Sequence, residues 1–80
     1  MKINNFELMN NKKIINSVKK EMGTEDWIRM CLHYRNKRNI TTILGAISEK
    51  YGSLSKSFEY SFRAEMNETV DTYLKKINAK

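Results

Sequence analysis

Apolar side chains recur every three or four residues along almost the whole chain, and no stretch alternates apolar and polar residues long enough for a strand. This spacing places apolar residues on one face of a helix, so the chain must fold by packing helices together. Its 80 residues allow one domain with a thin core. Because the sequence also has no proline, we predict an all-α fold, a small four-helix bundle.

Glycines mark most of the predicted helix boundaries. Gly23 is expected to end the first helix in a left-handed conformation, and Thr24 to cap the second. Asn39 or Thr41 is expected to cap the third helix, and Gly52 to close it. The predicted helices span residues 6–22, 25–36, 40–51 and 54–77.

Composition and charge narrow the class of protein. No run of eighteen apolar residues is present to span a membrane, and the first residues lack the pattern of a secretory signal. The cytoplasm is therefore the expected location. The net charge is +6, and residues 1–40 hold most of the basic excess. A basic balance favours polyanionic partners, although lysines also simply solvate helix surfaces.

The sequence offers no catalytic or metal-binding constellation. Cys31 and His33 are the only cysteine and histidine, and two residues apart on a helix their side chains diverge. They cannot supply the ligands that zinc needs. Cys31 is expected to be a small core residue, and the serines have no base partner. We predict a protein without cofactors that is not an enzyme.

Residues 44–63 carry the pattern of a helix-turn-helix. That motif needs a small residue where its helices meet, apolar neighbours on either side, and a glycine with positive φ at the turn. Ser48 and Gly52 fit these positions, with Ile47 and Tyr51 as the apolar neighbours and Phe58 as the next core residue. Two ordinary helices joined by a glycine turn would give a similar pattern.

Two blocks of the sequence resemble the C-terminal DNA-binding domain of the sporulation response regulator family. Residues 21–35 (EMGTEDWIRMCLHYR) are similar to that domain's first turn and second helix. Residues 47–63 are similar to its helix-turn-helix, including small residues at Ser53 and Ser61. The resemblance implies a second helix that enters the major groove. Glu59 and Arg63 match the family there, whereas Ser57 and Tyr60 replace its arginines.

The expected DNA contacts fall into three groups. Outward residues of the recognition helix would read bases, backbone amides at its N-terminus would bind a phosphate, and a basic stretch before the third helix would contact further phosphates. For the basic residues, the alternative is a solvated surface side chain. The base-reading group is Lys56, Ser57, Glu59, Tyr60, Arg63 and Asn67; the amides are those of Ser53 and Ser55; the basic stretch is Arg35, Lys37 and Arg38.

The predicted function is sequence-specific binding of double-stranded DNA by a small transcriptional regulator. The rival prediction is a phage or mobile-element protein that keeps the helix-turn-helix fold but inhibits a host protein. The replaced recognition arginines favour the rival, and the basic charge favours DNA.

The last predicted helix carries a longer apolar stripe than a compact helix-turn-helix needs to cover. The stripe either packs back on the first helix, around 14–18, or meets its own copy in a homodimer. The candidate dimer residues are Val70, Tyr73, Leu74 and Ile77.

Overall fold

The computed structural model describes residues 5–78, with side chains from Glu7 onward. This range contains four α-helices and no strand, so the predicted all-α, four-helix class is confirmed. No helix in the described range is long and apolar enough to cross a membrane. The helices are α1 (Asn5–Met22), α2 (Thr24–Tyr34), α3 (Thr41–Tyr51) and α4 (Phe58–Asn78).

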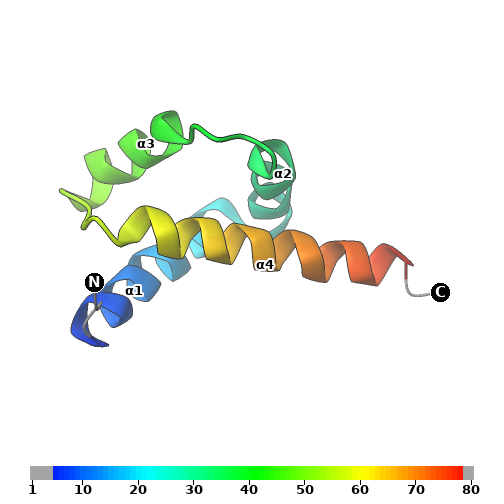
Figure 1. Cartoon of the computed structure of the whole chain (residues 1–80), viewed down its shortest axis with the longest axis horizontal. Helices are drawn as coiled ribbons and strands as arrows, with labels where there is room; N and C mark the ends of the chain where they lie inside the picture. The colour runs from blue at the N-terminus through cyan, green and yellow to red at the C-terminus, as the bar shows by residue number, and fades with distance from the viewer. Residues whose placement is uncertain (1–4, 79–80) are drawn as a thin grey trace.

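The longest helix, α4, forms the axis of the molecule (Figure 1). Helices α1 and α2 pack against it and against each other. Helix α3 leads from α2 back toward the beginning of α4, so the two ends of the described chain lie at opposite ends of α4 (Figure 1).

The core follows the apolar stripe of α4. Phe62 is fully buried, where its ring stacks on Phe58 and meets Trp27 edge to face, each at a centroid distance of 5.7 Å. The indole Nε1 of Trp27 donates to Thr69 at 2.9 Å, which also ties α2 to α4. Every helix contributes to this one core, whose buried apolar residues are Ile15, Trp27, Cys31, Ile40, Ile47, Phe58, Phe62, Met66 and Val70.

The junction of α1 and α2 differs from its prediction. Gly23 has the expected positive φ, 87°, but its ψ of 155° is extended and lies outside the left-handed helical region. Gly23 itself occupies the N-cap position of α2, and Thr24 is the first helical residue. The prediction that Thr24 caps α2 is therefore wrong, because Gly23 is the only residue between the two helices and itself takes the N-cap position.

The boundaries of α3 agree better with the sequence. The side chain of Asn39 accepts a hydrogen bond from the backbone amide of Thr41 at 2.8 Å, but Ile40 is the N-cap residue, so the prediction that Asn39 or Thr41 caps this helix is wrong. Gly52 closes the helix with φ 88°, and its amide donates to the carbonyl of Ser48 at 2.8 Å. Helix α2 ends at Tyr34 rather than at residue 36.

Helix α4 begins at Phe58, later than the predicted residue 54. The segment before it forms a turn in which the amide of Phe58 donates to the carbonyl of Ser55. Serine hydroxyls compete with helical hydrogen bonds, and here they are used in a tertiary contact instead. The connection between α3 and α4 therefore spans residues 52–57, which is longer than the short turn predicted for a helix-turn-helix.

The only cysteine of the sequence is a core residue, as predicted. Cys31 is completely buried, and desolvation raises the pKa of its thiol to about 11. Because each pKa unit changes the thiolate fraction tenfold, we expect native Cys31 to react with a disulfide reagent at least ~100-fold more slowly than in the unfolded chain. Absorbance of the released thiol at pH 8, with and without denaturant, checks this. Equal rates would contradict the burial.

Candidate nucleic-acid interface

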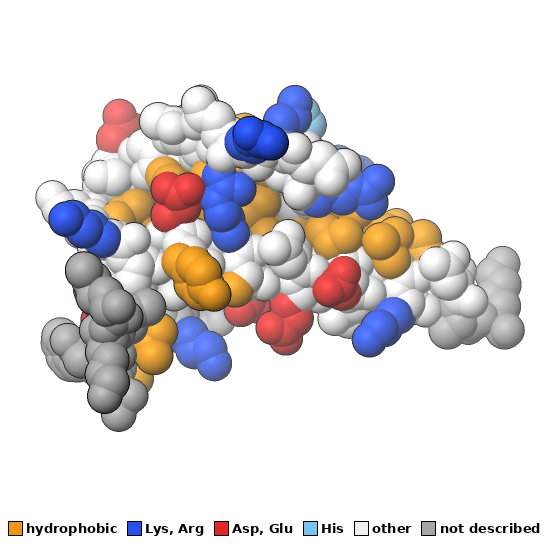
Figure 2. Space-filling model, in the orientation of Figure 1, with side chains coloured by type: hydrophobic (Ala, Val, Ile, Leu, Met, Phe, Trp, Pro, Cys, Tyr) orange, Lys and Arg blue, Asp and Glu red, His pale blue; other side chains and the backbone are white. Residues whose placement is uncertain are grey.

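Three cations protrude from the connection between α2 and α3, residues 35–40, here called the basic loop. Arg35, Lys37 and Arg38 are all exposed. Lysine and arginine side chains gather at this edge of the molecule in the space-filling view (Figure 2). Exposed cations on a short connection are suited to contact the phosphates of a nucleic acid without reading its sequence.

Arg63 of α4 holds the basic loop in place. Its Nη1 donates to the carbonyl of Lys37 at 3.1 Å, and its Nη2 donates to the carbonyl of Arg38. Its Nε donates to Glu59, one helical turn earlier, at 3.1 Å. The planar guanidinium thus satisfies three acceptors at once. The structure thus gives Arg63 an intramolecular role, and its predicted contact with a base stays a prediction.

The outward face of α4 next to this anchor is formed by Tyr60, Ala64 and Asn67. All three are exposed, and the Tyr60 side chain is 74% accessible. Glu59 is also exposed as predicted, although it shares its carboxylate with Arg63. Lys56 is exposed in the turn before the helix. Lys56, Glu59, Tyr60 and Asn67 keep the outward positions that the sequence predicted for them.

Two of the serines before α4, Ser55 and Ser57, turn their hydroxyls toward α1, whereas Ser53 is exposed. Asn11 of α1 is 1% exposed, and its Nδ2 donates to the hydroxyl of Ser57 at 2.9 Å. The hydroxyl of Ser55 donates to Oδ1 of Asn11 at 3.2 Å. The predicted outward orientation of Ser57 is therefore wrong. The phosphate site on the amides of Ser53 and Ser55 also loses its basis, because α4 begins only at Phe58.

Asn11 was not singled out by the sequence analysis, although it lies one helical turn before Ile15 on the apolar face of α1. Asn11→Ala would leave the serine hydroxyls around it without their buried partner, and we expect a loss of about 1–3 kcal/mol in unfolding free energy. Asn10→Ala, one residue away and exposed, should change it by less than about 0.5 kcal/mol. Urea denaturation followed by circular dichroism measures both. Equal effects would contradict the role of Asn11.

Part of the apolar stripe that was proposed for dimerisation is buried within the chain itself. Val70 is buried in the core, and Leu74 packs against it, so the intramolecular alternative holds for these residues. This half of α4 contacts α2, where the Trp27 indole donates to Thr69; the sequence suggests residues 14–18 of α1 as one of two alternative partners. Tyr73 is half-buried, and Ile77, at the end of α4, remains 49% exposed. Val70 is therefore not available to a homodimer contact, and the homodimer itself stays a prediction.

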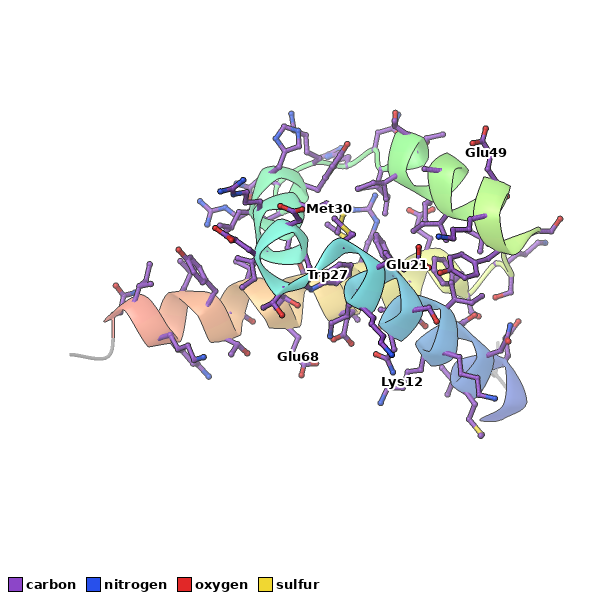
Figure 3. The ribbon with its side chains drawn as sticks, turned by 180° about the vertical axis from the view of Figure 1, so that it is seen from behind. Lys12, Glu21, Trp27, Met30, Glu49 and Glu68 are labelled. Atoms are coloured by element: carbon purple, nitrogen blue, oxygen red, sulfur yellow. The ribbon has the colours of Figure 1, made fainter. Side chains whose placement is uncertain are left out.

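A second flank of the outward face of α4 is formed by α1. Lys12 and Tyr60 line the same shallow hollow between α1 and α4, and Lys12 is exposed. Glu68 lines this hollow too and points to the same side of the molecule as Lys12 (Figure 3). Farther along the contact between α1 and α4, the ammonium of Lys19 forms an ion pair with the carboxylate of Glu65 at 2.9 Å. The exposed face of α4 is thus bordered by the basic loop on one side and by a mixed edge of Lys12, Glu65 and Glu68 on the other.

The described residues contain no group of three histidine, cysteine or acidic side chains that could hold a metal ion. His33 is exposed, and its ring meets Tyr34 edge to face at a centroid distance of 4.8 Å. Cys31 is buried on another face of α2. The structure therefore does not bring Cys31 and His33 together.

Comparison of the whole chain with protein-family models, with curated proteins and with solved structures finds no match.

Proposed function

We propose that this chain binds double-stranded DNA through the outward face of α4 and the basic loop. One observation carries the proposal: Arg63 fixes the basic loop directly beside the N-terminal half of α4, so that three exposed cations flank an exposed helical face. The net charge of +6 and the resemblance to the sporulation response regulator's DNA-binding domain support it further.

In this proposal α4 enters the major groove, which is wide enough for one helix. Arg35, Lys37 and Arg38 contact phosphates on one side of the groove, and Lys12 does so on the other. Tyr60 and Asn67 are the side chains that meet base edges, since asparagine pairs with adenine and tyrosine can contact a thymine methyl group. Arg63 supports the loop and does not read a base.

The affinity of the full chain for random duplexes should depend strongly on salt. If three to four cations contact phosphates, log K should fall against log salt with a slope of about −3 to −4, since each contact contributes about 0.9. Fluorescence anisotropy with a labelled 20-base-pair duplex between 50 and 200 mM salt measures this slope. No binding at 50 mM salt, or a slope near zero, would contradict the proposal.

A second candidate function, binding of a host protein, is favoured by a different observation. Leu8, Met9 and Tyr60 are large exposed apolar side chains, and all three line the hollow between α1 and α4. Clustered apolar exposure of this kind is typical of protein contacts. The double variant Leu8→Ser, Met9→Ser should keep the duplex affinity if DNA is the partner. If wild type shows no duplex binding, this patch becomes the better-supported functional surface.

A further inference from the structure

A mostly apolar cavity of about 270 Å³, open to solvent on one side, lies between part of α3 and the helices beneath it. All four helices contribute to its wall, and the polar residues of its lining are Glu21 and Lys50, with the phenol of Tyr51 beside them. Met30 of α2 and Glu21 of α1 lie on opposite sides of this space beneath α3 (Figure 3). Its main apolar lining residues are Val18, Met22, Met30, Ile43, Ile47 and Phe62.

Helix α3 is held on the core at both ends and by Ile47, and the cavity opens where α3 carries a small side chain. Ile40, just before α3, is buried in the core, and Tyr51, its last residue, packs against the core. Between them Ala46 lines the cavity with a single methyl group. Ala46 is exposed at the open side of the cavity, and a larger apolar residue at this position would cover and partly fill it.

A polar bridge closes one rim of the cavity. The carboxylate of Glu21 accepts a hydrogen bond from the Tyr51 hydroxyl at 2.6 Å and forms an ion pair with Lys50. The hydrogen bond from Lys50, then that from Tyr51, lower the pKa of Glu21. The two charges at the rim thus neutralise each other. A charged ligand would have to compete with this pair, whereas an uncharged one would leave it intact.

We propose that the cavity beneath α3 binds a compact, uncharged, apolar molecule about the size of a bicyclic aromatic ring system. Small-molecule sites are concave and mostly apolar with a few polar groups, and this open cavity of about 270 Å³ has that character and room for two fused rings. Met22 and Met30 line the site with flexible, polarisable side chains that adapt to a planar ligand. The ligand would fix α3 on the body of the protein. This inference does not depend on DNA binding.

The test uses the full chain with naphthalene as the probe and 2-naphthoate as its charged analogue. Naphthalene should raise the melting temperature by a few degrees, because a ligand that binds only the folded state stabilises it. In carbon–proton correlation spectra it should shift the methyl resonances of Ile43, Ile47 and Met30. The methyl resonances of Leu8 and Met9, which line a different hollow, should not move. Binding of 2-naphthoate should be at least tenfold weaker.

Ala46→Leu and Ala64→Leu form the matched pair of variants. Both alanines are exposed helical residues, but only Ala46 lines the cavity. Ala46→Leu should abolish the naphthalene shift of the melting temperature, and Ala64→Leu should respond like wild type. If Ala46→Leu does not fold, the test rests on the shifts that naphthalene causes in the methyl resonances of the wild-type protein. Unmoved methyls of Ile43 and Ile47, or equal binding of the two probes, would overturn the proposal.

Discussion

Phe62→Ala is expected to lower the free energy of unfolding by about 3–5 kcal/mol, a large fraction of what an 80-residue domain has. Phe62 is fully buried at the point where α2 meets α4, with Trp27 against its edge and Phe58 against its face. Its removal would leave a void between rings that the helix backbones hold apart. We therefore expect a chain that is partly unfolded at 37 °C.

Tyr60→Ala is the matched control, because it truncates a similar ring on the same helix. The Tyr60 side chain is 74% exposed, so we expect its loss to change the unfolding free energy by less than about 0.5 kcal/mol. Urea denaturation followed at 222 nm compares the two variants. A similar loss in both would mean that α4 does not present Phe62 to the core and Tyr60 to solvent.

The helical class could be predicted from the sequence because each helix carries a continuous apolar register. Phe58, Phe62, Met66 and Val70 follow each other at four-residue intervals, and all four are buried in one core. Their burial depends only on local spacing, which the sequence displays. The positive φ of Gly52 was predictable for the same reason, since it ends a periodic segment.

The features that could not be predicted depend on contacts between distant parts of the chain. Ser55 and Ser57 look like helix-capping residues. Their hydroxyls instead form hydrogen bonds with the side chain of Asn11, more than forty positions earlier in the sequence. The direction of Arg63 depends on the carbonyls of the basic loop, which come near α4 only in the folded chain. The apolar stripe around Val70 is equally compatible with an internal or an intermolecular partner until α2 is placed beside it.

Neutralising the basic loop is expected to have the largest effect on DNA affinity. The triple variant Arg35→Gln, Lys37→Gln, Arg38→Gln removes three exposed cations, and the backbone carbonyls of residues 37 and 38 remain available to Arg63. If each cation contacts a phosphate, the slope of log K against log salt should flatten by about 2.7. Over a fourfold rise in salt, wild type should then lose about 40-fold more affinity than the variant.

A control variant that loses the same number of charges elsewhere distinguishes a local contact of the basic loop with DNA from a general attraction between the positive protein and DNA. Lys20→Gln, Lys75→Gln, Lys76→Gln also removes three exposed cations, from α1 and from the last turns of α4. The most direct measurement is the salt slope of both triple variants on one random duplex by fluorescence anisotropy. Binding through the basic loop predicts a flattened slope for the loop variant and a nearly unchanged slope for the control. Equal slopes in the two variants would contradict it.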